Sequence, residues 1–562
     1  MKKLKYLIII AVTLMAISCK KDFLVMQQLY QKTDASYYSN PAEVEQGLTG
    51  IYSCLTTSAG ADEPIFLAEL LSDDRFGGGG TNDLQMHATD AFASSGVDMY
   101  LEMYSDAYKG IFRSNLLLKR FSNADYKFDT VSKNQDHGEA YFLRAYYYFR
   151  LAEFFGTIPM PLDPAPSNLP KAKVDDLFAQ IATDLKSAIE IMPAIPFTSI
   201  PTSRLGHATK WAAEGLMARV FLFYTGYYSK DALPLPGGGS ITKAQVVTWV
   251  DDCVANSGHG LIPDFRNLWP YTYSSPLGPS YPYVAHNHLH WIGDSTNIET
   301  VFAIKFSPYG GWSAPSQELY YSNQLVLYMG MRLPQIYTPW AQGWGGGPVS
   351  PLLWDSFEPN DIRQVGSILN VNINDTFNEG DFVKHYKWGA DNQYQETGIW
   401  QKKYIPVQVP DTGSKSYGKL IGMFCVMYGA PNNYQLWNMQ DEVLIRFADI
   451  LLMGAELGST KAQTYFDAVR IRAGLTSKPV TLDNIKLERR HELAFEGLRY
   501  FDLLRWHDEV DAFSKLVNIP IKNAGVAATY TATYRPETGG FLPIPESQVT
   551  NSAGVLLQNP GW

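Results

Sequence analysis

Apolar residues recur at helical spacing in two long blocks of the chain, residues 41–257 and 440–506. The stretch 138–155 shows the pattern well, because residues three or four apart share one side of an α-helix. Gly156 follows it, a residue type that often ends a helix. Both blocks are therefore predicted to be helical. One face of this stretch carries Phe142, Ala145, Tyr146, Phe149 and Ala152.

The predicted helices follow one another in pairs, with alanine and glycine at the positions where two helices would touch. Small side chains at such positions and successive helix pairs suggest stacked hairpins of the tetratricopeptide type. A clean repeat of about 34 residues is not visible by eye. The pattern thus predicts a mostly α fold built of helix hairpins.

Residues 258–439 show no sustained helical period and are rich in Pro, Gly, Asn, Tyr and Trp. Within them, residues 301–306 form a short apolar run that predicts a strand. We therefore expect long loops and short strands that pack on the helical body. Together, residues 41–562 are predicted to form a single domain.

The first residues have the features of a targeting segment. Lysines at positions 2, 3 and 5 precede an apolar run over residues 6–17, which is short for a membrane-spanning helix. Cys19 follows directly, which predicts a lipoprotein signal peptide over residues 1–18, a lipid on Cys19 and a tether over residues 19–40. An ordinary secretory signal with an incidental cysteine is the alternative.

The charge balance and the cysteines exclude several classes of function. The formal net charge is −10 and no basic stretch stands out, so we expect no nucleic-acid partner. Cys54, Cys253 and Cys425 lie far apart without zinc-like spacing, which favours small buried side chains. Histidines alternate at positions 286, 288 and 290, but an exposed strand or turn is favoured over a metal site. We predict neither a metal nor another cofactor.

The most informative composition bias is aromatic. Residues 265–344 contain seventeen aromatic side chains in eighty residues, against 14% aromatics for the chain. The C–H face of a pyranose packs on an aromatic ring, and indole or phenol groups remain to bind hydroxyls. Aromatic loops therefore predict a glycan platform, although each ring by itself is more simply a residue that anchors a loop to the core.

The run Gly77–Gly80 is not a phosphate-binding loop, since no Gly-Lys-Ser/Thr follows it. We expect a flexible surface loop. Asp73, Asp74 and Arg75 precede it and Asp83 follows it. Planar charged groups of this kind hydrogen-bond sugar hydroxyls, so the segment is a candidate part of a ligand site.

Residues 488–506 carry alternating charges at helical spacing, which would place them along one helix face. Glu492 and Glu496 resemble the carboxylate pair of a glycoside hydrolase, but neighbouring arginines would lower their pKa values and spoil a general acid. A zinc-protease motif fails, because Phe495 stands where a second histidine is required. The charges are predicted to form a structural salt-bridge network.

Several stretches, in order along nearly the whole chain, resemble the SusD/RagB family. The strongest match, at residues 488–506, reads ERRHELAFEGLRYFDLLRW. The other matches are GEAYFLRAYYYF at 138–149, residues 208–220, IRFADILLM at 445–453, VRIRAGL at 469–475, FLPIP at 541–545 and QNPG at 558–561.

The resemblance implies a mostly α fold: a tetratricopeptide-like helix-hairpin body with a ligand face of long loops and a few short strands. It also implies a non-enzymatic lipoprotein of the bacterial cell surface that delivers oligosaccharide to a SusC-like TonB-dependent outer-membrane transporter. A peptide ligand is the alternative, and a glycoside hydrolase is less favoured. The candidate ligand-binding residues are Asp73, Asp74, Arg75, Trp269, Tyr283, Trp291, Trp312, Tyr320, Trp340 and Trp344.

Overall fold

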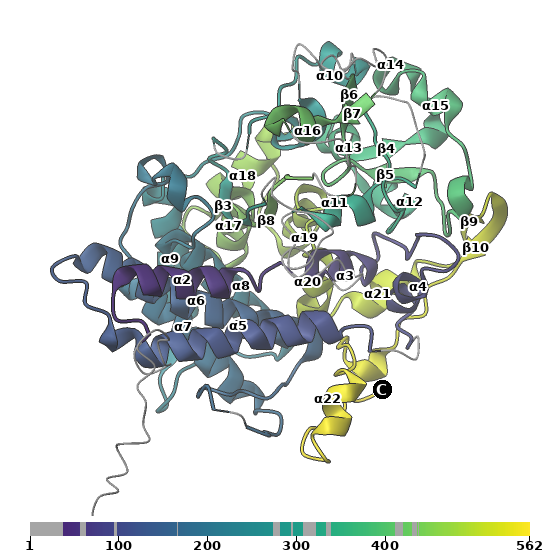
Figure 1. Cartoon of the computed structure of the whole chain (residues 1–562). Helices are drawn as coiled ribbons and strands as arrows, with labels where there is room; N and C mark the ends of the chain where they lie inside the picture. The colour runs from purple at the N-terminus through teal and green to yellow at the C-terminus, as the bar shows by residue number, and fades with distance from the viewer. Residues whose placement is uncertain are drawn as a thin grey trace, which may run out of the picture.

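A computed structural model gives the fold of the chain (Figure 1). The predicted signal peptide, Cys19, Trp312 and Tyr320 lie outside the residues that it describes. Among the described helices, none combines the length and the apolar character needed to cross a bilayer. The described residues are 37–56, 63–94, 98–165, 167–273, 281–293, 296–306, 322–332, 339–410, 420–429, 435 and 438–562.

The two predicted helical blocks are present, and consecutive helices pack side by side from α5 to α9 and again from α17 to α18. This arrangement confirms the prediction of helix hairpins. The first block contains α2 (Pro41–Tyr52), α3 (Pro64–Leu70), α4 (Leu84–Asp90), α5 (Leu101–Arg120), α6 (Thr130–Phe155), α7 (Val174–Ile191), α8 (Lys210–Tyr227) and α9 (Lys243–Asn256). The second contains α17 (Phe447–Glu456), α18 (Ala462–Arg472), α19 (Leu482–Glu492) and α20 (Arg499–Trp506). Two short helices follow it, α21 (Glu509–Ser514) and α22 (Glu546–Asn551).

The described residues within 258–439 lie mainly in the upper right of Figure 1 and consist of short elements joined by loops. Loops and short strands were predicted there, and the structure adds short helices. Their helices are α10 (Pro282–His286), α11 (Gln324–Met329), α12 (Pro351–Ser356), α13 (Ile362–Ser367), α14 (Thr376–Glu379), α15 (Phe382–His385) and α16 (Met423–Tyr428). The strands of the whole described chain form antiparallel pairs. They are β1 (Ala232–Pro234) with β2 (Ser240–Thr242), β3 (Thr300–Ile304) with β8 (Glu442–Arg446), β4 (Ile368–Asn370) with β5 (Ile399–Gln401), β6 (Gln408–Pro410) with β7 (Leu420–Gly422), and β9 (Ile519–Asn523) with β10 (Val526–Tyr530).

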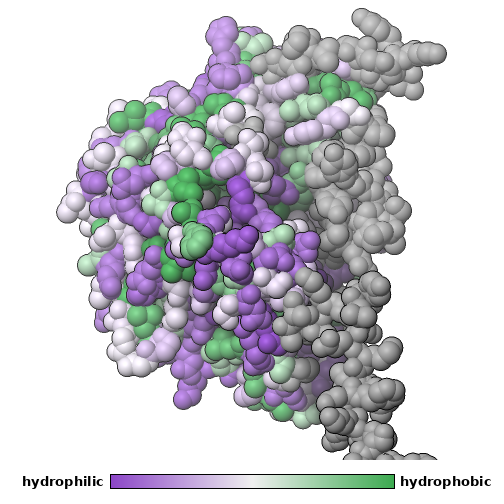
Figure 2. Space-filling model, turned by 60° about the vertical axis from the view of Figure 1, so that its left-hand side comes forward, coloured by the Kyte–Doolittle hydropathy of each residue, from purple (hydrophilic) through white to green (hydrophobic). Residues whose placement is uncertain are grey.

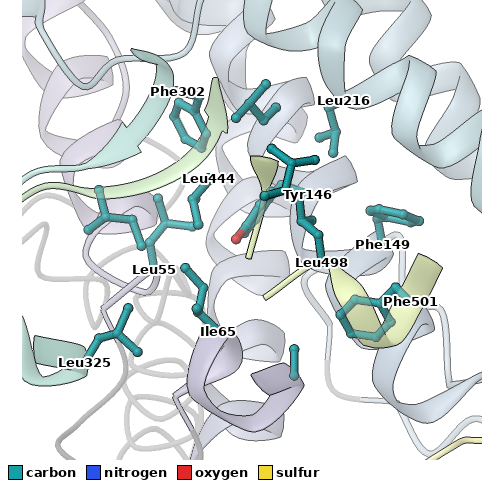
Figure 3. Close-up of a cluster of buried hydrophobic side chains, with 14 of the residues drawn as sticks. Leu55, Ile65, Tyr146, Phe149, Leu216, Phe302, Leu325, Leu444, Leu498 and Phe501 are labelled. Carbon is teal, nitrogen blue, oxygen red and sulfur yellow. The ribbon is translucent and has the colours of Figure 1, made fainter. Parts of the chain in front are cut away.

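The helical blocks and the middle region share one hydrophobic core. Figure 3 shows Tyr146 and Phe149 of α6 near Leu216 of α8, Phe302 of β3 and Phe501 of α20. Large aromatic side chains remove much apolar surface from water, so this shared core fixes the middle region on the helices. On the coloured part of the face in Figure 2, polar and apolar residues are interspersed and no extended apolar patch appears.

Two predicted helical stretches are wrong in detail. Residues 442–446 form strand β8, because they pair with β3. The segment 488–506 is two helices rather than one: α19 ends at Glu492 and α20 begins at Arg499. Phe495 and Gly497 between them have φ of 68° and 69°, outside the α-helical region. Glu496, which lies in this break, pairs with the buried cations Lys403 and Arg446.

One loop prediction is also corrected. Gly77–Gly80 is not an exposed flexible loop, since all four residues are buried. The three alternating histidines lie at the end of α10 and in the turn and loop that follow it, which agrees with the predicted turn and not with a strand. In the described part of the chain no group of His, Cys, Asp or Glu is arranged to hold a metal. Cys54, Cys253 and Cys425 are buried and none of them is in a disulfide, which confirms their interpretation as small core side chains.

Candidate functional site

Three segments far apart in the sequence meet at a pocket of about 380 Å³. They are the start of α4, residues 328–332 together with 342–344, and the turn around Asp391. Both the glycine-rich segment and the aromatic region singled out in the sequence contribute to it. The pocket, which we call the Trp344 pocket, is lined by Asp83, Met86, Tyr328, Arg332, Gln342, Gly343, Trp344 and Asp391.

Close backbone contact between two glycine runs lies against Arg332, one of the residues that line this pocket. The N–H of Gly79 donates to the carbonyl of Gly345 (2.7 Å), and the N–H of Gly347 donates to the carbonyl of Gly77 (3.0 Å). Gly78 has φ of +67°, and a Cβ there would lie 2.4 Å from the Gly345 oxygen. Glycine is therefore required by both conformation and space.

Arg332 is the centre of the charged wall. Its Nη1 lies 3.3 Å from Asp83 Oδ2, and its Nε lies 3.1 Å from Asp391 Oδ2. Its Nη1 also donates to the Trp344 carbonyl (3.2 Å). The arginine side chain is 22% exposed, so its guanidinium is held in one orientation and still borders solvent. A fixed, planar donor group between two carboxylates suits recognition of vicinal hydroxyls.

Trp344 forms the aromatic wall and is half-buried. Its ring stands perpendicular to that of Tyr328, with centroids 4.9 Å apart. The backbone N–H of Trp344 donates to the Leu327 carbonyl (2.7 Å), which fixes the backbone at this position. The indole is thus anchored on one side and presents part of its surface to the pocket.

The structure gives Asp73, Asp74 and Arg75 intramolecular partners. Asp73 accepts from Nε and Nη2 of Arg499, both at 2.8 Å, and Asp74 accepts from Arg490. Burial alone would raise the pKa of Asp73, but the two guanidinium groups hold it below its ordinary value. Arg75 is buried over the Phe495 ring. These three residues brace the segment that carries Asp83, and a ligand contact for them stays a prediction.

The predicted aromatic residues divide into buried and half-buried rings. Trp269, Tyr283 and Trp340 are buried, and lysine ammonium groups lie 4.8 Å from the first ring and 4.9 Å from the second. Trp291 is half-buried and packs perpendicular to Phe424, with centroids 5.8 Å apart, outside the Trp344 pocket. Of the predicted residues that the structure describes, only Trp344 lines this pocket, beside Asp83.

Arg332 and Asp391 were not predicted from the sequence. A signal for Arg332 exists, because it is the only lysine or arginine between Lys305 and Arg363. A single cation within a long aromatic stretch needs a partner or a function. Asp391 had no such signal, since only the tertiary structure brings it to Arg332.

The predicted salt-bridge network of residues 488–506 is confirmed. Glu492 and Glu496 are buried, and Arg446 binds both, at 2.6 Å and 2.7 Å. Burial would raise the pKa of Glu492, but Arg472, Arg446 and Arg363 hold it well below its ordinary value. A carboxylate in this state cannot act as a general acid.

Comparison with known proteins places the chain in one family. A model described as "SusD family" matches residues 299–562, and a second, described as "Starch-binding associating with outer membrane", matches residues 26–222. SusD-like protein P2 of Formosa agariphila is 22% identical over 555 residues, covering 94% of each chain.

Solved structures share the fold. A laminarin binding SusD-like protein has a TM-score of 0.70 at 24% identity, covering 93% of this chain and 100% of its own. Surface glycan-binding protein A from Bacteroides thetaiotaomicron, solved with laminarihexaose, has a TM-score of 0.71 at 19% identity, covering 92% and 99%. With two family models matching successive parts of the sequence, the chain belongs to the SusD/RagB family.

Proposed function

We propose that this protein captures oligosaccharides in the Trp344 pocket and delivers them, without cleaving them, to a SusC-like TonB-dependent outer-membrane transporter. A lipid on Cys19 would hold it at the outer membrane, facing the cell exterior. One observation carries the proposal: a half-exposed indole stands beside an arginine that two carboxylates hold in place.

The chemistry of the pocket fits a sugar. The C–H face of a pyranose packs on the Trp344 indole, while Arg332, Asp83 and Asp391 offer donors and acceptors to hydroxyl groups in the ring plane. Because the arginine is already ordered by its ion pairs, little side-chain entropy is lost when a ligand binds. Capture requires no acid–base pair, and the conspicuous carboxylates Glu492 and Glu496 are buried in ion pairs.

The relatives support the ligand class and the location. One solved relative is named for laminarin binding and another was solved with laminarihexaose. The family description for residues 26–222 refers to starch binding and to association with the outer membrane. The aromatic platform inferred from the sequence is consistent with these names.

A binding screen with matched tryptophan variants tests the proposal. The chain from residue 20 is run in native gels that contain polysaccharides, then titrated by calorimetry with oligosaccharides and with peptides. We expect Trp344→Ala to weaken glycan binding at least about tenfold with little change in melting temperature. Trp340→Ala, in contrast, should destabilise the fold by about 3–5 kcal/mol, because that indole is buried.

The same screen separates the alternatives. If a glycan retards the wild type in the gel and the Trp344→Ala variant binds that glycan with the same affinity, the ligand binds elsewhere. Binding of peptides and of no glycan would favour a peptide-uptake lipoprotein, and release of sugar products would indicate a hydrolase. Protease treatment of intact cells tests the location, because a protein shielded until the outer membrane is broken does not face the exterior.

A further inference from the structure

A second pocket, of about 530 Å³, lies between α5 and α22, and we call it the α5–α22 pocket. In Figure 1 α22 lies at the lower end of the molecule, apart from α11 and the Trp344 pocket, and the two pockets share no lining residue. Its principal lining residues are Tyr104, Tyr108, Asn168, Gln548, Asn551 and Leu556.

The α5–α22 pocket is uncharged. None of its eleven lining residues is Asp, Glu, Lys, Arg or His, whereas three of the eight residues that line the Trp344 pocket are charged. The two tyrosines stay neutral at physiological pH, since burial raises the pKa of Tyr104 to about 12 and that of Tyr108 well above its ordinary value. A lining of amides, phenols and apolar groups offers hydrogen bonds without favouring either sign of charge.

The walls are fixed by hydrogen bonds between lining residues and by one at the start of α22. The Tyr108 hydroxyl donates to the Pro159 carbonyl (2.7 Å), and Asn168 Nδ2 donates to the Ser552 carbonyl (2.9 Å). Asp98 accepts from the N–H of Glu546 (2.6 Å) and so holds the start of α22. The pocket is therefore formed before any ligand arrives, which lowers the entropic cost of binding.

Two carboxamides are available on α22. Gln548 and Asn551 are three residues apart, so they share one face of the helix, and both are at least partly exposed. Neither side chain has a hydrogen-bond partner among the described residues of the chain. Each carboxamide offers both a donor and an acceptor, the combination that a sugar hydroxyl uses.

We propose that the α5–α22 pocket is a second glycan-binding site, which takes a short neutral stretch of a polysaccharide. Its volume is within the usual range for small-ligand sites, and its lining matches an uncharged polyhydroxyl ligand with one apolar face. The inference rests on the proposed function for its ligand class, but it concerns a separate site. Two sites on one chain would retain a polymer more strongly than a short oligosaccharide.

Calorimetry on the full-length protein in detergent tests this site. Three neutral probes, laminarihexaose, maltohexaose and cellohexaose, are titrated into the wild type, Trp344→Ala, a Gln548→Ala/Asn551→Ala double variant and the combined triple variant. We expect Trp344→Ala to retain one weaker binding event, the double variant to lose that event, and the triple variant to lose both. Affinity for the parent polysaccharide should fall about fivefold in the double variant.

Thr550→Ala is the matched control, because Thr550 is exposed on the same helix and does not line the pocket. It should bind like the wild type. Absence of any binding to the Trp344→Ala protein up to about 10 mM, where even weak sites are seen, overturns the second site. The same holds if binding survives in the triple variant, or if a neutral Gly/Asn/Ser hexapeptide binds in place of the sugars.

These outcomes separate the two proposals. If Trp344→Ala leaves every affinity unchanged while the double variant loses binding, the second site stands and the Trp344 pocket fails. If the wild type binds one hexasaccharide and Trp344→Ala abolishes it, the primary site stands alone.

Discussion

The helical blocks and the middle region, residues 258–439, are stabilised in different ways. In the helical blocks, backbone hydrogen bonds are made within each helix, and apolar faces pack against each other. In the middle region the elements are short, so fewer backbone groups are paired within a helix or strand. Buried charged side chains also stabilise this region. Lys402 and Arg363 are fully buried there, each within 2.7 Å of a carboxylate. Buried irregular structure thus requires side chains that pair with its backbone N–H and C=O groups.

Arg446 joins the two regions and gives the largest expected effect. It lies on β8 and binds Glu299, Glu492 and Glu496 at 2.8 Å or less. We expect Arg446→Met to lower the free energy of unfolding by about 4 kcal/mol, because it leaves buried carboxylates without a partner. Chemical denaturation measures the change. Lys515→Met, which breaks an exposed pair with Asp511, should cost less than about 0.5 kcal/mol; equal effects of the two changes would contradict a structural role for the network.

A buried carboxyl group in the helical body, that of Glu214, should make the stability of the fold depend on pH. Burial raises the pKa of Glu214 on α8 to about 8, and Lys210 at 3.3 Å offsets this only in part. The folded state holds this proton while the unfolded state releases it near pH 4.5, so stability falls as pH rises from about 5 to 8. Glu214→Gln has no titrating proton at this position. Its free energy of unfolding should therefore rise relative to that of the wild type by about 3 kcal/mol between pH 5 and pH 8. Denaturation at pH 5 and pH 8 checks this, and a difference between the two proteins that is the same at both pH values would rule it out.

The glycine contact beneath the Trp344 pocket should tolerate no side chain. Gly78→Ala would place Cβ 2.3 Å from Pro348 Cδ at a φ of +67°, and we expect a loss of about 2 kcal/mol together with weaker glycan binding. Gly237→Ala is the control: φ is +81°, but no atom lies within 4 Å of the new Cβ, so only the backbone cost of about 1 kcal/mol remains. Thermal denaturation measures both variants. Equal melting temperatures of Gly78→Ala and Gly237→Ala would show that the close contact is unimportant.

The smallest effect on the fold should come from the exposed part of the site. Asp391 is 56% exposed, so Asp391→Asn should change stability by less than about 0.5 kcal/mol. It should weaken glycan binding about threefold, because Arg332 loses one of the carboxylates that orient it. Calorimetry with the best-bound glycan measures this. An unchanged affinity would mean that Asp83 alone positions the arginine.

Much of the fold could be predicted because helical periodicity is a local property. The stretch 138–155 contains its own apolar face and its own glycine stop, and α6 ends at Phe155. Prediction failed where distant partners decide the conformation. Residues 442–446 are a strand because β3 lies beside them. The charged segment 488–506 is interrupted at Phe495 and Gly497, both with positive φ, and Glu496 between them pairs with Lys403 and Arg446 of other elements.

The candidate site shows the same division. Aromatic enrichment pointed to the correct region, but composition cannot tell a buried ring from an exposed one. Trp340 and Trp344 are four residues apart, yet one is 1% exposed and the other borders the pocket. Asp73 to Arg75 met the chemical requirement for sugar contacts, and the structure pairs all three internally.

The sequence by itself determined the family, the helical blocks and the aromatic character of the middle region, because these depend on residue types and on spacings along the chain. Only the tertiary structure decided which charges are buried in ion pairs, which tryptophan faces a pocket, and that Arg332 lies between Asp83 and Asp391. The physical reason is that burial and pairing depend on contacts between residues tens to hundreds of positions apart, and local pattern carries no information about them.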